Sequence, residues 1–180
     1  MSTYTIVSID PGWLNTGWVA IQDGKPVDAG VIVNDNARAK RRTRTERTRD
    51  IIIDVMAVLN MYKPDVVVYE RNLGSLSVRA ATAMRAAYTI VVSALAALGY
   101  DNERCIELTP QAVRKHITGK GNGTPKHLLN EWIRARPNFR DLTKVLTDQG
   151  ICESKMEHAL DAALLGYVAM RMDEVRRLLP

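Results

Sequence analysis

The sequence predicts a single α/β domain in which a mixed five-stranded sheet is flanked by helices. Three short apolar segments punctuated by glycines open the chain between residues 4 and 34. Two further apolar segments, at 66–70 and 105–108, alternate with segments of helical periodicity. Neither an internal repeat nor a long linker divides the 180 residues, so one domain spanning residues 1–180 is expected.

The strands follow from the apolar segments and the turn signals between them. The first three are expected at 4–9, 16–22 and 28–34, paired in antiparallel order. Asp23-Gly24 is a strong hairpin signal between the second and the third. The fourth strand, 66–70, is continuously apolar up to its last residue, which is typical of a strand covered on both faces.

The helices before the last strand are two long segments. The first is expected at 38–62, charged in its first half and apolar in its second, and Lys63-Pro64-Asp65 ends it. The second, 75–98, is rich in alanine and ends at Gly99. Its small residues allow a close approach by another helix, which indicates either burial or a dimer interface.

The helices of the last third are predicted mainly from their starts. Thr109-Pro110 and Thr124-Pro125 each indicate a helix with Thr at the N-cap and Pro at the first helical position. The second of these is expected to end near residue 135, and a final helix is expected at about 153–178. The stretch 137–150 gives no clear signal.

Composition indicates a soluble protein of the cytoplasm. The hydrophobic fraction of 46% is that of a globular chain. The two cysteines, Cys105 and Cys152, lie far apart, which fits a reducing compartment and excludes a cysteine-rich zinc site. We see no signal peptide pattern and no apolar run approaching the roughly 20 residues of a membrane span.

The positive charge is concentrated in two segments. The net charge is +5, and residues 38–49 alone hold seven basic residues and one acidic residue, a local sum of +6. A second basic segment runs from Arg114 through Lys115 and Lys120 to Lys126 without an acidic residue. Clustered bases attract phosphates, so both segments predict contact with nucleic acid, while a solvated helix face or a dimer contact also explains 38–49.

Four ionisable residues stand where metal ligands are expected. Asp10 ends the first apolar segment, just before Pro11-Gly12, and Glu70 ends the fourth. His158 and Asp161 are three residues apart in a helical segment, so both project from one face. Such a set suits divalent metal and phosphodiester cleavage by the two-metal route. Taken singly, each residue also has a structural explanation as a turn or surface residue.

These motifs resemble the RuvC family of Holliday junction resolvases, within the RNase H-like superfamily, nearly from end to end. The matching motifs are Ile9-Asp10-Pro11-Gly12 with Thr16-Gly17-Trp18, Val67-Val68-Tyr69-Glu70, and His158-Ala159-Leu160-Asp161-Ala162. Between them, Thr109-Pro110 through Val113-Arg114-Lys115 to Gly119, Gly121 and Lys126 resembles the family's basic glycine loop. The loop points to RuvC rather than to the superfamily at large.

The resemblance implies an RNase H-like fold and a homodimeric endonuclease that resolves four-way or other branched DNA by paired symmetric nicks in recombination and repair. It implies two Mg²⁺ or Mn²⁺ ions in each active site. The residues that it makes catalytic and metal-binding are Asp10, Glu70, His158 and Asp161. The residues that it places on DNA are Leu73, Arg114, Lys115, Lys120 and Lys126. It implies no membrane contact and leaves a branch-migration partner open.

The sequence departs from the family's pattern at three points. The best-known members carry Asp where this chain has His158, and imidazole suits Mn²⁺ better than Mg²⁺, with Glu157 as a substitute ligand. Members commonly carry an aromatic residue where this chain has Leu73, which cannot stack like a ring. One extra residue, through Gly123-Thr124-Pro125, precedes Lys126.

Three other functions share parts of this pattern. A related nuclease that cuts flaps or RNA–DNA hybrids would use the same order of ligands. Actin-like ATPases and sugar kinases also carry Asp-x-Gly followed by Thr-Gly, but they are usually twice this length, with a second lobe. The third is a junction-binding protein that has lost catalysis. His158 suggests this possibility, because the best-known members carry Asp at that position.

Overall fold

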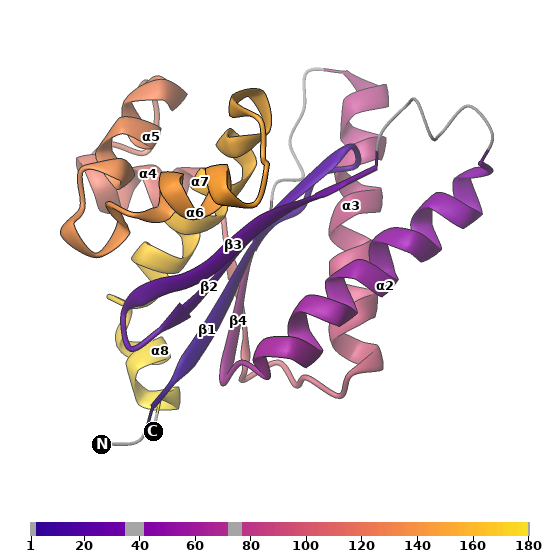
Figure 1. Cartoon of the computed structure of the whole chain (residues 1–180), viewed down its shortest axis with the longest axis horizontal. Coiled ribbons are helices and arrows are strands. Elements are labelled where there is room, and N and C mark those ends of the chain that lie inside the picture. Colours follow the sequence, from indigo (N-terminus) through magenta and orange to yellow (C-terminus); the bar gives the residue numbers. More distant parts are fainter. Residues whose placement is uncertain (1–2, 35–41, 72–76, 180) are drawn as a thin grey trace.

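The computed structural model describes residues 3–34, 42–71 and 77–179, and it has the expected α/β architecture (Figure 1). Five strands form one sheet in the order β3-β2-β1-β4-β5. β1 pairs antiparallel with β2 and parallel with β4, so the sheet is mixed, as predicted. The strands are β1 (Thr5–Asp10), β2 (Asn15–Gln22), β3 (Lys25–Val33), β4 (Val66–Glu70) and β5 (Cys105–Leu108).

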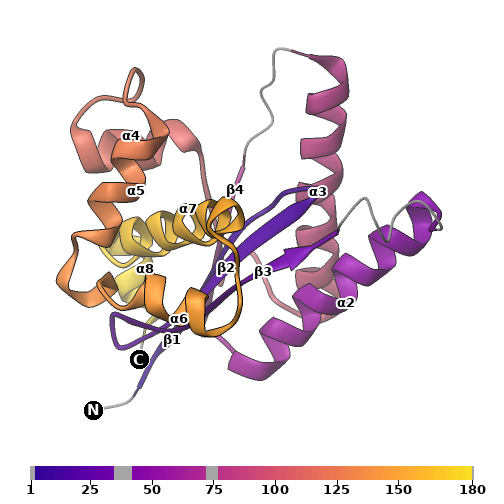
Figure 2. The same ribbon diagram turned by 45° about the horizontal axis from the view of Figure 1, so that its top comes forward.

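Helices cover both faces of the sheet. α2 (Arg44–Tyr62) and α3 (Val78–Ala97) pack together on one face, and the remaining helices cover the other (Figures 1 and 2). The remaining helices are α4 (Pro110–Thr118), α5 (Lys126–Arg134), the 3-10 turn η1 (Pro137–Phe139), α6 (Leu142–Asp148), α7 (Glu153–Ala169) and α8 (Asp173–Leu178).

The alternation of side chains along β1 and β4 decides which face carries the acidic residues. In β1, Ile6 packs into the core under α7 and Val7 into the core under α2 and α3. In β4, Val68 packs into the core under α7. Successive side chains of a strand point to opposite faces. Asp10 and Glu70, in phase with Ile6 and Val68, therefore both lie on the α7 face.

The turn between β2 and β3 confirms the hairpin prediction. Asp23 and Gly24 both have positive φ, 49° and 78°. Two central residues with positive φ define the two-residue turn that matches the twist of an antiparallel pair, and Asn, Asp and Gly adopt it most readily. This hairpin sets the register of β2 against β3, in which Gln22 pairs with Lys25.

Two glycines let the backbone of α7 lie directly on the sheet. A Cβ atom on Gly17, which pairs with Asp10 across the strands, would lie 2.0 Å from the carbonyl oxygen of His158. Further along α7, a Cβ atom on Gly166 would lie 2.4 Å from Cδ1 of Ile21. No other residue type fits at either contact without displacement of its neighbours, because real Cβ atoms do not approach so closely.

The predicted helix over 38–62 begins later than expected, at Arg44. Thr43 is its N-cap: the hydroxyl accepts a hydrogen bond from the N–H of Glu46, and the Glu46 carboxylate accepts one from the N–H of Thr43 at 2.7 Å. This reciprocal capping box supplies a strong start signal that the run of basic residues obscures. Residues 35–41 lie outside the described part of the chain.

Two later boundaries also differ from the prediction. The single helix expected over 153–178 is divided into α7 and α8, and the break lets Val175 turn fully into the core. Pro125, rather than Thr124, is the N-cap residue of α5, and it makes no side-chain cap. The hydroxyl of Thr124 lies 3.4 Å from that of Thr118, the last residue of α4, instead. It therefore closes the loop between α4 and α5 and does not cap α5.

Replacing Gly17 by Ala is expected to lower the free energy of unfolding by about 3 kcal/mol, the upper end of overpacking penalties, because the new methyl group meets the α7 backbone. Urea titration would measure it. Gly121→Ala is the matched control, since a Cβ there meets nothing closer than a carbonyl oxygen at 3.8 Å. Equal stability of the two variants would contradict the close contact.

Candidate active site

The four predicted ligand residues come together where β1 and β4 end under α7. Asp10 and Glu70 are the last residues of adjacent parallel strands. The Nδ1 atom of His158 lies 3.5 Å from Oδ2 of Asp10, and Asp161 follows His158 by three residues on the same helix. Both α7 residues face the strand ends because the helix backbone touches β2 at Gly17. His158 and Asp161 therefore project from the same face of α7, as their i, i+3 spacing predicts.

The loop after Asp10 is held closed by one buried hydroxyl. Thr16, 2% exposed, donates a hydrogen bond to the carbonyl oxygen of Gly12 at 2.9 Å. Gly12 is required in this turn, since a Cβ there would lie 2.0 Å from the carbonyl oxygen of Asn15. The tight loop limits the positions that Asp10 can take.

The end of β4 is anchored by contacts to β5. The N–H of Arg71 donates to the carbonyl oxygen of Leu108 at 2.8 Å, and its guanidinium lies 3.4 Å from the Glu107 carboxylate. The hydroxyl of Tyr69 donates to the same carboxylate at 3.1 Å. Glu70 thus stands between two residues that are both tied to Glu107.

Burial and mutual repulsion disfavour full ionisation of the acidic cluster. The pKa of Glu70 is raised far above its usual value, first by burial and then by the neighbouring Asp10, with which it also shares a hydrogen bond. The pKa of Asp161 is raised by burial and by Asp10, while Lys126 and His158 act in the opposite direction. Three carboxyl groups in one small space carry more negative charge than their surroundings neutralise.

Lys126 contacts this cluster with its ammonium group, although 48% of its side chain is exposed. Its Nζ atom is 2.6 Å from Oδ2 of Asp161 and 3.4 Å from Oε2 of Glu157. Arg114 lies close by, since both basic residues line a hollow of about 250 Å³ together with Glu70 and Asp161. The prediction of Lys126 as a phosphate contact did not foresee that it would pair with a candidate ligand.

The other predicted DNA contacts have different positions. Lys115, in the last turn of α4, and Lys120, in the following loop, are both exposed. Neither forms an ion pair within the described ranges of the chain. Leu73 lies outside the described residues. The structure therefore divides the basic segment into an inner pair, Arg114 and Lys126, and an outer pair.

A divalent cation fits the chemistry of the acidic cluster. Carboxylate oxygens, as on Asp10, Glu70 and Asp161, are the ligands that Mg²⁺ and Mn²⁺ prefer. Burial and the neighbouring Asp10 raise the pKa of Glu70 and of Asp161, so a bound cation would favour their ionised forms. Among residues 3–34, 42–71 and 77–179, no three acidic, imidazole or thiol side chains already form a metal-ligand group. The ammonium group of Lys126 holds Asp161 instead.

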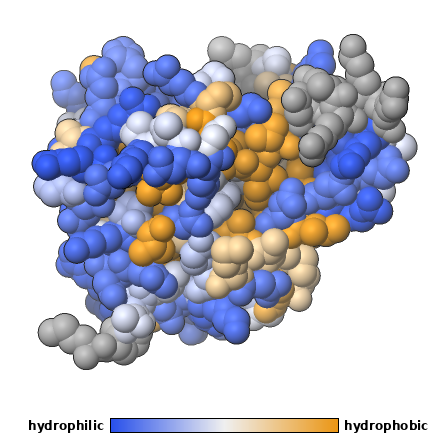
Figure 3. Space-filling view, viewed as in Figure 1, coloured by the Kyte–Doolittle hydropathy of each residue, from blue (hydrophilic) through white to orange (hydrophobic). Residues whose placement is uncertain are grey.

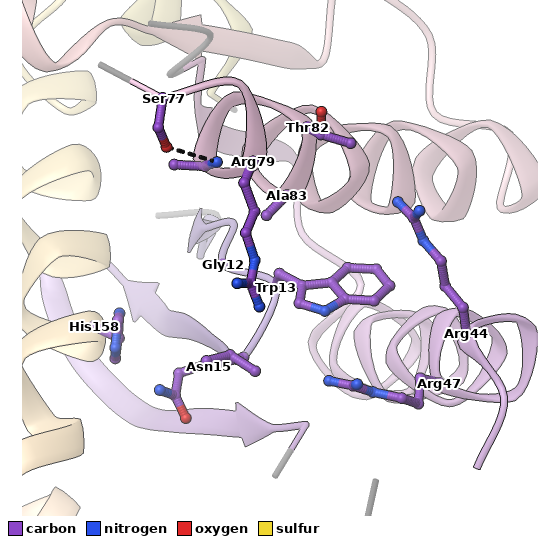
Figure 4. A pocket seen from close by; sticks show the side chains of 12 residues that line it. Gly12, Trp13, Asn15, Arg44, Arg47, Ser77, Arg79, Thr82, Ala83 and His158 are labelled. Carbon is purple, nitrogen blue, oxygen red and sulfur yellow. Dashed lines mark hydrogen bonds between the residues drawn. The ribbon is translucent and has the colours of Figure 1, made fainter. Parts of the chain in front are cut away.

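A groove of about 1000 Å³ opens on the far side of His158 (Figure 4). Trp13 and three arginines, Arg44, Arg47 and Arg79, are among its lining residues. The sequence prediction missed Trp13 and Arg79, because a lone tryptophan after a turn and a lone arginine at a helix start form no pattern. Arg44 and Arg47 were recognised only as members of the basic run.

Replacing Glu70 by Gln is expected to stabilise the metal-free protein more at pH 8 than at pH 5. A carboxyl whose pKa is raised by folding stabilises the fold below its ordinary pKa, and this contribution is lost as pH rises through the folded-state value. Gln removes that loss. Thermal unfolding in EDTA at the two pH values would measure it, with Glu131→Gln, an exposed residue of α5, as the control. A pH-independent difference would contradict the raised pKa.

This chain is similar in sequence to known proteins. The family model described as crossover junction endodeoxyribonuclease RuvC matches residues 6–134, which include Asp10, Glu70 and the basic glycine loop and end before α7. A RuvC of Neorickettsia sennetsu is 25% identical over 179 residues, 95% of each chain. A RuvC of Hahella chejuensis is 30% identical over 121 residues, 65% of this chain and 66% of its own.

Solved structures share the fold. T. thermophilus RuvC in complex with Holliday junction substrate has a TM-score of 0.68 and 18% identity, covering 93% of each chain. The yeast mitochondrial Holliday junction resolvase Ydc2 has a TM-score of 0.61 and 18% identity over 97% of this chain and 80% of its own. The predicted RNase H-like fold is thereby confirmed. With its family model matched over most of its length, the chain belongs to the RuvC family of crossover junction endodeoxyribonucleases.

Proposed function

We propose that this chain is a metal-dependent endonuclease that resolves four-way DNA junctions by paired symmetric nicks. One observation carries the proposal: the carboxyl groups of Asp10, Glu70 and Asp161 meet at the ends of β1 and β4 under α7, in a chain of the RuvC family. The T. thermophilus relative with the same fold is described in complex with Holliday junction substrate. Members of the family are metal-dependent nucleases.

The three carboxylates would hold the cations, two in each site. Bound divalent cations supply Lewis acidity at the scissile phosphate and lower the pKa of the attacking water. His158, with Nδ1 3.5 Å from Asp10 and Nε2 4.0 Å from Glu157, would hold that water or serve as a ligand. Attack by water forms a phosphorus–oxygen bond and breaks the bond to the 3′ oxygen, which leaves a 5′ phosphate.

Lys126 would have one role in the metal-free protein and another on DNA. Without a cation, its ammonium group offsets the charge of Asp161 and Glu157. Where Asp161 held a cation instead, this ammonium group would be free to contact a backbone phosphate. Lys115 and Lys120, exposed beside it, would hold further phosphates, with Arg114 in support. Such contacts provide affinity and position rather than base preference.

The RuvC family acts as a dimer on branched DNA, and α3 offers the surface for a second copy. This helix is long and apolar enough, by length and composition alone, to span a membrane. Only 28% of its most apolar window is buried within the protein, so much of its apolar surface is exposed. Figure 3 shows apolar surface between the two helical flanks, in the region that α3 occupies in Figure 1. Val78, at its start, is 86% exposed. A two-fold dimer would present two active sites, from which paired nicks follow.

Two alternatives remain within the same fold and site. A nuclease that cuts flaps or RNA–DNA hybrids would use the same carboxylates on a different substrate. A junction-binding protein without catalysis would keep the basic surface alone, but the retained acids and their unfavourable crowding argue for catalysis. The ATPase reading has no support, because the family model identifies RuvC.

The proposal is tested by cutting of an immobile four-way junction beside duplex, flap, single-strand and RNA–DNA hybrid controls. We expect symmetric paired nicks on the junction, in the presence of Mg²⁺ or Mn²⁺. Cutting of flaps or hybrids in preference to the junction would show that one of these, and not the four-way junction, is the substrate. Binding without cutting in either metal would support the non-catalytic alternative.

Asp10→Asn should reduce the nicking rate by more than about 100-fold, since loss of even an outer partner of a metal site lowers activity 10- to 100-fold. Junction affinity in EDTA should change little, because Asp10 lies under α7 and not on the basic surface. Single-turnover cleavage and fluorescence anisotropy would measure the two effects. Asp148→Asn, an exposed residue at the end of α6, is the control. Nicking by Asp10→Asn at the wild-type rate would remove Asp10 from the mechanism.

His158→Asp should shift the ratio of Mn²⁺-supported to Mg²⁺-supported nicking towards Mg²⁺ by about tenfold, because an oxygen donor replaces imidazole beside Asp10. Titration of nicking rate against each metal would measure the ratio. His127→Asp, on the exposed start of α5, is the control for a new charge. A ratio equal to that of the wild type would exclude His158 as a ligand.

A further inference from the structure

The groove beside His158 is built from three separate parts of the chain. The loop between β1 and β2 contributes Trp13, the start of α2 contributes Arg44 and Arg47, and the start of α3 contributes Arg79. Figure 4 shows Arg79 reaching from α3 towards the loop, with the α2 arginines on the other side of the indole. Since Gly12 and His158 also line it, the groove is continuous with the candidate active site.

Trp13 has the surroundings of a stacking surface. Its indole is half-buried against the core under α2 and α3, which holds the ring in place. The guanidinium carbon atoms of Arg44 and Arg47 each lie 5.3 Å from the ring centroid. A rigid aromatic ring beside guanidinium groups is the combination that binds an unpaired base together with its phosphates.

The charge of the groove favours a polyanion. Among the described residues, three arginines line it and no acidic residue does. Within the described parts of the chain, no carboxylate lies within 4.0 Å of Arg44, Arg47 or Arg79. Arg47 has a structural task, since its Nε donates to Oδ1 of Asn34 at 3.1 Å. In the same described parts the Arg44 guanidinium contacts only the Trp13 ring and the Arg79 guanidinium makes no hydrogen bond, so both retain donors for a ligand.

We propose that this groove binds an unpaired nucleotide next to the scissile phosphate, with its base stacked on Trp13 and its phosphates held by Arg44 and Arg79. The inference rests on the proposed function and names a specificity element for it. A volume of about 1000 Å³ accommodates a nucleotide and parts of its neighbours, at the upper end of the roughly 300–1,000 Å³ of ligand pockets. Stacking on Trp13 draws one nucleotide out of the junction and leaves its phosphodiester beside His158.

The test uses 2-aminopurine placed singly on each side of the expected nick in a four-way junction, with EDTA to prevent cutting. Stacking on the indole should quench its fluorescence several-fold at one position in the wild type. Trp13→Leu, which keeps apolar bulk without a ring, should abolish the quenching and weaken junction binding roughly tenfold, within the range measured for base stacking. Trp13→Phe should keep part of both signals.

Trp132 is the matched control, because it also carries an arginine, with Arg136 3.8 Å from its ring, but lies in α5 against Tyr167 and away from the groove. Trp132→Phe should leave the quenching intact. Arg44→Ala and Arg79→Ala should each reduce the slope of log affinity against log salt by about one. Unchanged slopes together with unchanged quenching in Trp13→Leu would overturn the proposal.

Failure of the groove and failure of the proposed function have different signatures. If the wild type nicks the junction and Trp13→Leu matches it in quenching and affinity, the groove proposal is wrong and the nuclease stands. If Trp13 quenches 2-aminopurine in single-stranded DNA but the junction is not cut in either metal, the groove stands and the junction nuclease does not. Should Trp13→Leu fail to fold, Trp13→Phe and the two arginine variants decide.

Discussion

The site depends on one contact between backbones. Gly17 of β2 lies opposite Asp10, and with no side chain there the carbonyl group of His158 rests directly on the strand. This contact fixes both the distance and the rotation of α7 relative to the sheet. Gly166 repeats the arrangement further along the helix, against Ile21. Two points of contact define a line, so the helix has little freedom to slide or turn. His158 and Asp161 inherit their positions from it.

The acidic cluster is locally destabilising, and the remainder of the fold offsets that loss of stability. Buried carboxyl groups that raise one another's pKa oppose folding, and Lys126 relieves only part of that opposition. The cores on the two faces of the sheet supply the stability that permits it. Active sites commonly hold such unfavourable arrangements, because the groups that bind a cation or transition state cannot also satisfy one another.

The strand-end acids, the i, i+3 pair and the mixed sheet were predictable because each follows from a local pattern. Alternation along the strands places Asp10 and Glu70 on the same face of the sheet, and helical spacing places His158 and Asp161 on the same face of one helix. The position of Lys126 was not predictable, since it depends on how α5 packs against α7, which no local pattern encodes. The break after α7 was missed for the same reason: Val175 turns inward because a core lies there. Trp13 gave no signal because its neighbours come from α2 and α3.

The two-residue alternation of β1 has a consequence for how this chain can change in evolution. Loss or gain of one residue in β1 between Ser8 and Asp10 would move Asp10 to the face under α2 and α3, and a change in β2 between Asn15 and Gly17 would shift Gly17 from beneath α7. Such a shift would separate Asp10 from Glu70 or α7 from the sheet, so the strand register constrains the length of this segment. The exposed loop of Gly119 to Gly123 is under no such constraint, because no strand register runs through it. Differences in length among relatives should therefore accumulate in that loop, next to the basic residues, where they alter the reach towards DNA and leave the catalytic centre intact.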